Sequence, residues 1–131
     1  MKTILVDAVY CFIIEKDGSF VIFQDMYDLL ERYPNRKIIL TGANDDKFEF
    51  YGLNKMPYEF FTLKHNPEKT DPKYYETMLL HFGLSKDDII YFEHDQNAVK
   101  SAQSVGINTY YYDNDKKDLE SLKKFLDENL K

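Results

Sequence analysis

Short β-branched apolar runs alternate along this chain with stretches whose apolar residues recur at helical spacing, and this alternation constrains the fold more than any other feature. The runs expected to form strands are 3–6, 37–40, 58–63, 89–92 and 107–112. Helical spacing falls between and after them, in 26–33, 74–82, 98–105 and 119–126. Such alternation is typical of a parallel sheet with helices on both faces. We therefore expect an α/β, three-layer, Rossmann-like domain with a mainly parallel five-stranded sheet.

Turn and helix-end signals add detail to this prediction. Two apolar segments within 10–23 flank the turn signal Lys16–Ser19, which predicts a β-hairpin after the first strand. A short helix near 48–51 should stop at Gly52. The last helix should begin at Asp113 or Asp115. With 131 residues, no repeat and no low-complexity linker, we expect residues 1–131 to form one domain.

The net charge, the cysteine count and the length of the apolar runs exclude several classes of binding partner and protein. A formal net charge of -6 with scattered basic residues disfavours nucleic acid and anionic membranes as partners. The one cysteine, Cys11, excludes an internal disulfide and is expected to be a small buried hydrophobe. No run approaches the roughly 18 apolar residues that span a bilayer. We expect a cytoplasmic protein, and nothing indicates its oligomeric state.

Polar residues follow the first four predicted strands. They are Asp7, Thr41-Gly42, the segment 64–71 and the triplet Glu93-His94-Asp95. Because the carboxyl ends of parallel strands share one edge of the sheet, these groups should converge there. A carboxylate, a hydroxyl, an ammonium and a second acidic or imidazole group can together bind a phosphate and a divalent cation. An aspartate at such a site can also attack phosphorus.

Four segments in chain order, with the strand pattern, resemble the motifs of the haloacid dehalogenase-like superfamily. They are Ile4–Asp7, Ile38–Asn44, Lys69–Tyr75 and Tyr91–Asp95. The resemblance implies that Asp7 is the nucleophile and a metal ligand. It also implies that Thr41, Gly42 and Lys69 bind phosphate, that Lys69 pairs with the nucleophile, and that Mg²⁺ is the cofactor.

The hairpin resembles the flap of that family. Too few residues separate the motifs to hold a large cap domain, so the resemblance implies an open site. The expected partner is then a phosphorylated small molecule or a phosphoprotein.

Two departures from the family pattern bear on activity. Phosphatases of the family place a general acid/base aspartate two residues after the nucleophile, where this chain has Val9. Losing such a group typically slows a reaction by roughly 10²- to 10⁴-fold, and no other side chain near it is expected to move a proton to the leaving group. Counting back from Gly106 puts His94 at the position of the metal-binding aspartate, with Asp95 one residue later.

We therefore expect the metal ligands to be Asp7, His94 and Asp95. A histidine ligand favours a softer metal than Mg²⁺. Glu93 and Asp95 should point away from the side of His94 if the strand continues that far. Asp95 has an alternative role as the N-cap of the following helix.

The sequence supports two functions. The first is a Mg²⁺-dependent phosphohydrolase of low activity in which Asp7 attacks the phosphoryl group. The alternative is a catalytically inactive binding or interaction module with the same fold, which Val9 and the triplet Glu93-His94-Asp95 favour. A phospho-accepting receiver domain is disfavoured, because its acceptor aspartate should follow the third strand, where this chain has Lys64-His65.

Overall fold

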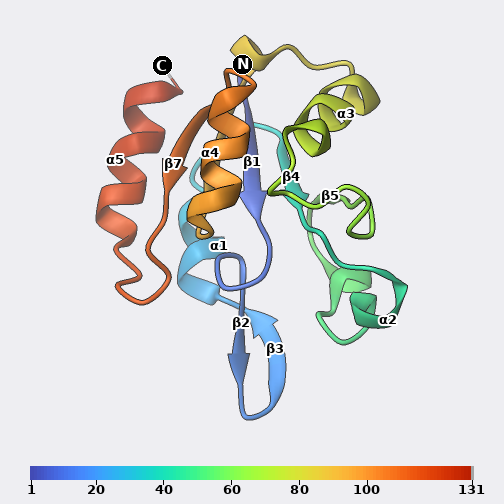
Figure 1. Cartoon of the computed structure of the whole chain (residues 1–131). Coiled ribbons are helices and arrows are strands. Elements are labelled where there is room, and N and C mark those ends of the chain that lie inside the picture. Colours follow the sequence, from blue (N-terminus) through green and yellow to red (C-terminus); the bar gives the residue numbers. More distant parts are fainter. Residues whose placement is uncertain (131) are drawn as a thin grey trace.

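A five-stranded parallel sheet forms the centre of the molecule, as a computed structural model describes it for residues 1–130. Its strands lie in the order β5-β4-β1-β6-β7 (Figure 1). Every neighbouring pair is parallel. The strands are β1 (Thr3–Asp7), β4 (Lys37–Leu40), β5 (Glu59–Phe61), β6 (Ile89–Glu93) and β7 (Asn108–Tyr111). The prediction of a parallel five-stranded sheet is confirmed.

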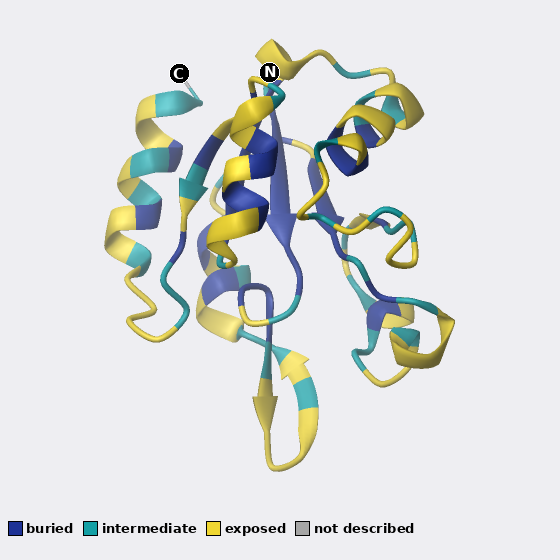
Figure 2. Ribbon diagram, viewed as in Figure 1, coloured by how far each residue is buried: buried dark blue, intermediate teal, exposed yellow. Residues whose placement is uncertain are grey.

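Helices cover both faces of this sheet. On one face α1 (Gln24–Leu30) and α5 (Leu119–Asn129) pack on alternate strand residues such as Val6 and Ile39. On the other, α3 (Pro72–Phe82) and α4 (Gln96–Ser104) pack on Leu5 and its neighbours. Because successive side chains of a strand point to opposite faces, the continuous apolar run of β1 serves both cores. This gives the three layers that the sequence predicts, with buried strands between exposed helix faces (Figure 2).

Two small excursions leave the carboxyl edge of the sheet. The hairpin of β2 (Ile13–Lys16) and β3 (Ser19–Ile22) follows β1 and turns at Asp17-Gly18, where both residues have positive φ. Between β4 and β5 lie α2 (Asp45–Phe48) and the 3-10 turn η1 (Leu53–Lys55). The predicted hairpin is confirmed. The helix expected at 48–51 lies instead at 45–48, and Gly52 with φ 68 follows it in a left-handed conformation.

The ends of two helices test the cap predictions. Helix α3 begins at Pro72 and ends at Gly83, whose φ of 65 suits a residue without Cβ, as expected. The predicted start of the last helix is wrong. Asp113 accepts the amides of Asp115 and Lys116 in a separate turn, and Asp118 caps α5 by accepting the Ser121 amide at 3.0 Å. None of the helices within residues 1–130 is long and apolar enough to cross a membrane.

Candidate functional site

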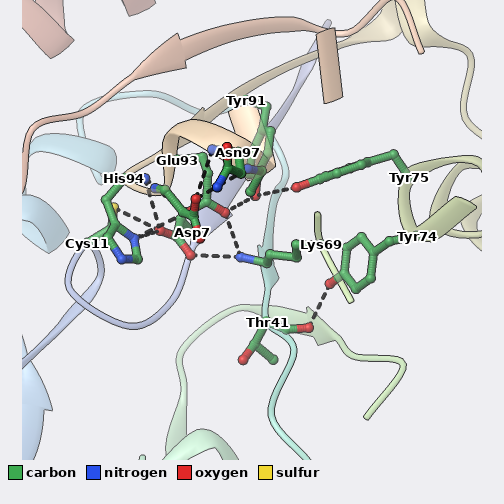
Figure 3. Close-up of polar contacts among 12 residues, drawn as sticks. Asp7, Cys11, Thr41, Lys69, Tyr74, Tyr75, Tyr91, Glu93, His94 and Asn97 are labelled. Carbon is green, nitrogen blue, oxygen red and sulfur yellow. Dashed lines mark hydrogen bonds and ion pairs between the residues drawn. The ribbon is translucent and has the colours of Figure 1, made fainter. Parts of the chain in front are cut away.

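The predicted site residues converge at the carboxyl edge of the sheet (Figure 3). Asp7 ends β1, Glu93 ends β6, Thr41 follows β4, and Lys69 lies in the loop before α3. They surround a pocket of about 300 Å³. Its lining residues are Asp7, Val9, Thr41, Gly42, His65, Glu68, Lys69, Thr70, Glu93, His94, Asp95 and Ala98. Parallel pairing of β4, β1 and β6 brings these residues together from distant parts of the chain.

Lys69 bridges two buried carboxylates. Its Nζ donates to Asp7 Oδ1 at 2.7 Å and to Glu93 Oε1 at 2.9 Å. Burial alone would raise the pKa of Asp7, but the Lys69 ammonium and the contacts with Glu93 and His94 hold it well below its usual range. Burial and the Asp7 charge raise the pKa of Glu93. Burial would lower the pKa of Lys69, yet the two carboxylates raise it, so Lys69 is a cation at neutral pH.

His94 makes a second set of contacts with the same carboxylates. Its backbone amide donates to Asp7 Oδ2 at 3.2 Å and to Glu93 Oε2 at 2.9 Å. Its ring Nδ1 contacts Asp7 Oδ2 and lies 3.2 Å from Glu93 Oε2. Burial would lower the pKa of His94, but the hydrogen bonds to Asp7 and Glu93 raise it to about 10. The ring is therefore an imidazolium at neutral pH, and it forms an ion pair with Asp7.

The expected alternation of side chains after β6 required the strand to continue to Asp95, but the strand ends at Glu93 and the chain turns there. The His94 ring then contacts Asp7 and also lies beside the Glu93 carboxylate. Asp95 instead accepts the amides of Asn97 at 2.9 Å and Ala98 at 3.4 Å, which makes it the N-cap of α4. Asp95 borders the pocket, but its carboxylate serves the helix end.

Cys11 is a site residue that sequence reasoning missed. The chain turns back after Ala8, with the Cys11 and Phe12 amides donating to the carbonyls of Ala8 and Asp7. This turn places the buried thiol 3.3 Å from Asp7 Oδ2, to which it donates. Burial and the negative charge of Asp7 raise the pKa of Cys11, so it is a neutral thiol. The predicted burial is confirmed, but the thiol contacts a carboxylate rather than only apolar groups.

Thr41 and Gly42 line the opposite side of the pocket. The buried Thr41 hydroxyl accepts the Ala43 amide at 3.1 Å, which leaves its own hydrogen available to a ligand. A Cβ on Gly42 would lie 3.2 Å from the ring of His65, so the absence of a side chain permits this close approach. Thr41 shares the pocket with Asp7 and Lys69 but makes no hydrogen bond to either within residues 1–130.

Glu93 is held by further donors. Its Oε1 accepts from Tyr91 at 2.5 Å as well as from Lys69, and its Oε2 accepts the Asp95 amide at 3.1 Å. The Tyr75 hydroxyl lies 3.3 Å from the Tyr91 hydroxyl and extends this hydrogen-bond network into the core. Both oxygens of Glu93 therefore already have protein donors.

Val9 lines the pocket and supplies no acid or base. Two other titratable groups, His94 and Cys11, contact the Asp7 carboxylate, and the expectation that no side chain replaces the missing acid at Val9 stays a prediction. The turn after β1 brings Cys11 to Asp7, and the turn after β6 brings His94 to it.

The donors present do not fit Mg²⁺, which prefers about six oxygen ligands. The Asp7 oxygens accept from Lys69 Nζ, Cys11 Sγ and both the amide and ring nitrogens of His94. Glu93 is similarly occupied, and Asp95 caps a helix. The atoms next to the Asp7 carboxylate are therefore nitrogen and sulfur atoms, whereas a hard cation such as Mg²⁺ binds oxygen ligands.

Comparison with known proteins identifies the fold. No family model matches the sequence, and no curated protein matches it significantly. An enzyme of the haloacid dehalogenase family from Bacteroides thetaiotaomicron, solved as a variant with magnesium and inorganic phosphate, superposes with a TM-score of 0.68 at 14% identity, covering 85% of this chain and 93% of that one.

Two further solved structures agree. A hydrolase from Streptococcus pneumoniae gives a TM-score of 0.64 at 17% identity, covering 84% of this chain and 59% of that one. An uncharacterized protein from Corynebacterium glutamicum gives a TM-score of 0.61 at 13% identity, covering 93% of this chain and 92% of that one. The chain therefore has the haloacid dehalogenase-like fold that the sequence motifs suggest.

Proposed function

We propose that this chain is a binding protein with the haloacid dehalogenase-like fold, which holds an oxyanion-bearing ligand without hydrolysing it. The observation that carries the proposal is the ion-paired state of Asp7. Lys69 occupies Oδ1, while Cys11 and His94 occupy Oδ2. The carboxylate that would attack phosphorus is thus a buried counter-ion for two cations.

Nucleophilic attack requires a lone pair of Asp7 directed at phosphorus, and both Asp7 oxygens already accept hydrogen bonds. To free Oδ2, the protein has to break charge-assisted hydrogen bonds in a site where Asp7 is only 4% exposed. Such bonds are roughly twice as strong as neutral ones. The lowered pKa of Asp7 also makes its carboxylate a poor nucleophile. Both effects disfavour an aspartyl-phosphate intermediate.

Departure of the leaving group is disfavoured as well. Val9 cannot donate a proton, and the absence of a positioned acid typically costs roughly 10²- to 10⁴-fold in rate. The donor set around Asp7 does not suit the Mg²⁺ ion that would neutralise a phosphoryl group. The nucleophile, the general acid and the metal site therefore each differ from those of an active phosphatase in a way that lowers the expected rate of hydrolysis.

The pocket retains groups that suit an oxyanion. Within the buried cluster the charges of Asp7 and Glu93 are balanced by those of Lys69 and His94, while Glu68 and Asp95 are two further acidic residues of the pocket lining. Lys69 has a third N–H beyond its two carboxylate contacts, and the Thr41 hydroxyl has a hydrogen to donate. The ligand class we propose is a phosphate or carboxylate group on a small molecule or a phosphoprotein.

A weak phosphohydrolase remains the second candidate, because the His94 imidazolium is a proton source beside Asp7. With a pKa of about 10 it is a poor acid at neutral pH, since general acids work best with a pKa near the operating pH. This candidate requires Asp7-dependent turnover.

Phosphate release from a panel of phosphomonoesters, with Mg²⁺ present, separates the two candidates. We expect equal background rates for the wild type and for Asp7→Asn. A rate that depends on Mg²⁺ and is abolished by Asp7→Asn would establish the hydrolase instead.

Ligand binding is tested by NMR titration with inorganic phosphate and phosphoserine. We expect the amide signals of Gly42 and Thr70 to shift in the wild type and much less in Thr41→Val, which keeps the volume but removes the hydroxyl hydrogen. Thr62→Val serves as a control, because its hydroxyl lies outside the lining of the pocket. Unchanged spectra of the wild type with both ligands would overturn the binding proposal.

A further inference from the structure

We propose that Asp7, Cys11 and His94 form a binding site for a borderline transition-metal ion of the Zn²⁺ class. Three different ligand types meet here: a carboxylate oxygen, a thiol sulfur and an imidazole nitrogen. One donor atom from each lies within 4.8 Å of the other two. The site does not depend on hydrolysis, but a bound ion would replace the ion pair between Asp7 and His94 on which the proposed function rests.

The distances suit a tetrahedral ion. Zn²⁺ binds sulfur at about 2.3 Å, and nitrogen or oxygen at about 2.0 to 2.2 Å, which places its ligands roughly 3.3 to 3.7 Å apart. Cys11 Sγ lies 3.3 Å from Asp7 Oδ2, within this range. His94 Nδ1 is in hydrogen-bond contact with the same oxygen, closer than two ligands of one ion lie, so an entering ion has to separate this pair.

The exchange balances in charge and protons. The ion would replace the proton on His94 Nδ1 and the proton on Cys11 Sγ, and both protons pass to solvent. A divalent cation thus replaces two protons, so the net charge of the cluster, including Lys69 and Glu93, is unchanged. The buried site therefore gains no uncompensated charge when it binds metal.

Neighbouring groups hold His94 beside Asp7. Glu93 Oε2 accepts its backbone amide at 2.9 Å, and the Tyr10 ring packs edge-on against the imidazole at 5.7 Å between centroids. Asp7 and His94 line the pocket, while Cys11 lies buried behind them. Because two of the three ligands line the pocket, water or a ligand oxygen in the pocket would have access to a bound ion.

Thermal unfolding with Zn²⁺ and with Mg²⁺ gives the first test. The protein is freed of metal with a chelator and then dialysed. We expect Zn²⁺ at 100 times its dissociation constant to raise the Tm by on the order of 10 °C, and equal Mg²⁺ to raise it by less than about 2 °C. Equal shifts with the two ions would overturn the proposal.

Cobalt absorption identifies the ligand directly. Because Cys11 is the chain's one cysteine, a thiolate-to-Co²⁺ charge-transfer band in the near ultraviolet can come only from this residue. We expect the band to appear in the wild type at one Co²⁺ per chain and to vanish on addition of Zn²⁺. Absence of the band would overturn the proposal even if every variant failed to fold.

Variants then separate this site from other metal-binding groups. Cys11→Ser and His94→Gln should each weaken Zn²⁺ binding at least 10-fold by calorimetry, while circular dichroism reports whether they fold. His81→Gln is the matched control, since His81 lies on α3 outside the pocket lining and should keep wild-type affinity. Zn²⁺ binding that survives both site variants and is lost in His81→Gln would overturn the assignment.

Discussion

Replacing Lys69 by Met should destabilise the protein strongly, because Lys69 is the cation that two buried carboxylates share. Its side chain is 14% exposed, against 4% for Asp7 and 1% for Glu93, so water screens these contacts little. Removing one partner from a buried ion pair typically costs about 3 to 5 kcal/mol. The substitution keeps the apolar stem and leaves the cluster with one excess negative charge.

Urea unfolding measures this cost. With an m-value of about 2 kcal/mol/M, a loss of about 4 kcal/mol lowers the unfolding midpoint by roughly 2 M. Lys64→Met is the matched control, because Lys64 pairs with Asp45 on the surface, where both side chains are more than half exposed. Such an exposed pair contributes at most about 1 kcal/mol.

Two secondary results belong to the same prediction. The destabilisation by Lys69→Met should shrink as the pH falls toward 5, because without Lys69 the pKa of Glu93 rises further and protonation removes the excess charge. Adding Glu93→Gln should recover part of the loss, because it leaves Asp7 paired with His94 alone. The reasoning is refuted if Lys69→Met costs no more than Lys64→Met, or if the Lys69 and Glu93 substitutions are simply additive.

Three further outcomes follow from the structure. Gly83→Ala should cost about 1 kcal/mol in urea unfolding, because φ at this position is 65; an unchanged midpoint would contradict this. Asp118→Ala should speed amide exchange in the first turn of α5, whereas Asp113→Ala should not; the reverse pattern would contradict the assigned cap. Val9→Asp combined with His94→Asp should create an oxygen-rich site that Mg²⁺ stabilises, detected as a Mg²⁺-dependent rise in Tm that the wild type lacks.

Much of the fold could be predicted because its causes are local. Continuous apolar runs such as 38–40 are buried on both faces of the sheet, and parallel pairing then brings the ends of β1, β4 and β6 to one edge. The convergence of Asp7, Thr41 and Lys69 follows from this topology alone, and the structure confirms their shared pocket. Their roles in binding or catalysis stay predictions.

The parts that could not be predicted depend on turns of a few residues. Cys11 reaches Asp7 only because Tyr10 adopts a positive φ of 67, which no sequence pattern indicates for a tyrosine. His94 faces Asp7 because β6 ends one residue before it. The start of α5, predicted at Asp113 or Asp115, was missed because Asp113 caps a separate turn and Asp118 caps the helix.

The ionisation of His94 also determines how stability depends on pH. Its folded pKa of about 10 lies above the unfolded value of about 6.5, so its contribution is complete below pH 6.5 and is lost as the pH rises through 10. The midpoint of urea unfolding in the presence of EDTA should therefore fall across this range, and His94→Gln should flatten the profile. A wild-type profile as flat as that of the variant would contradict the ion pair.

Nitrogen-15 NMR of the histidine rings from pH 5 to 11, in the metal-free protein, tests most directly whether Asp7 is bound by a cationic His94. Assignment is straightforward, because His65→Gln and His81→Gln identify the other two rings. We expect both ring nitrogens of His94 to stay protonated at pH 8 and the ring to titrate near pH 10. A neutral His94 ring at pH 8 would show that His94 is not a cationic partner of Asp7 and would contradict this ion pair.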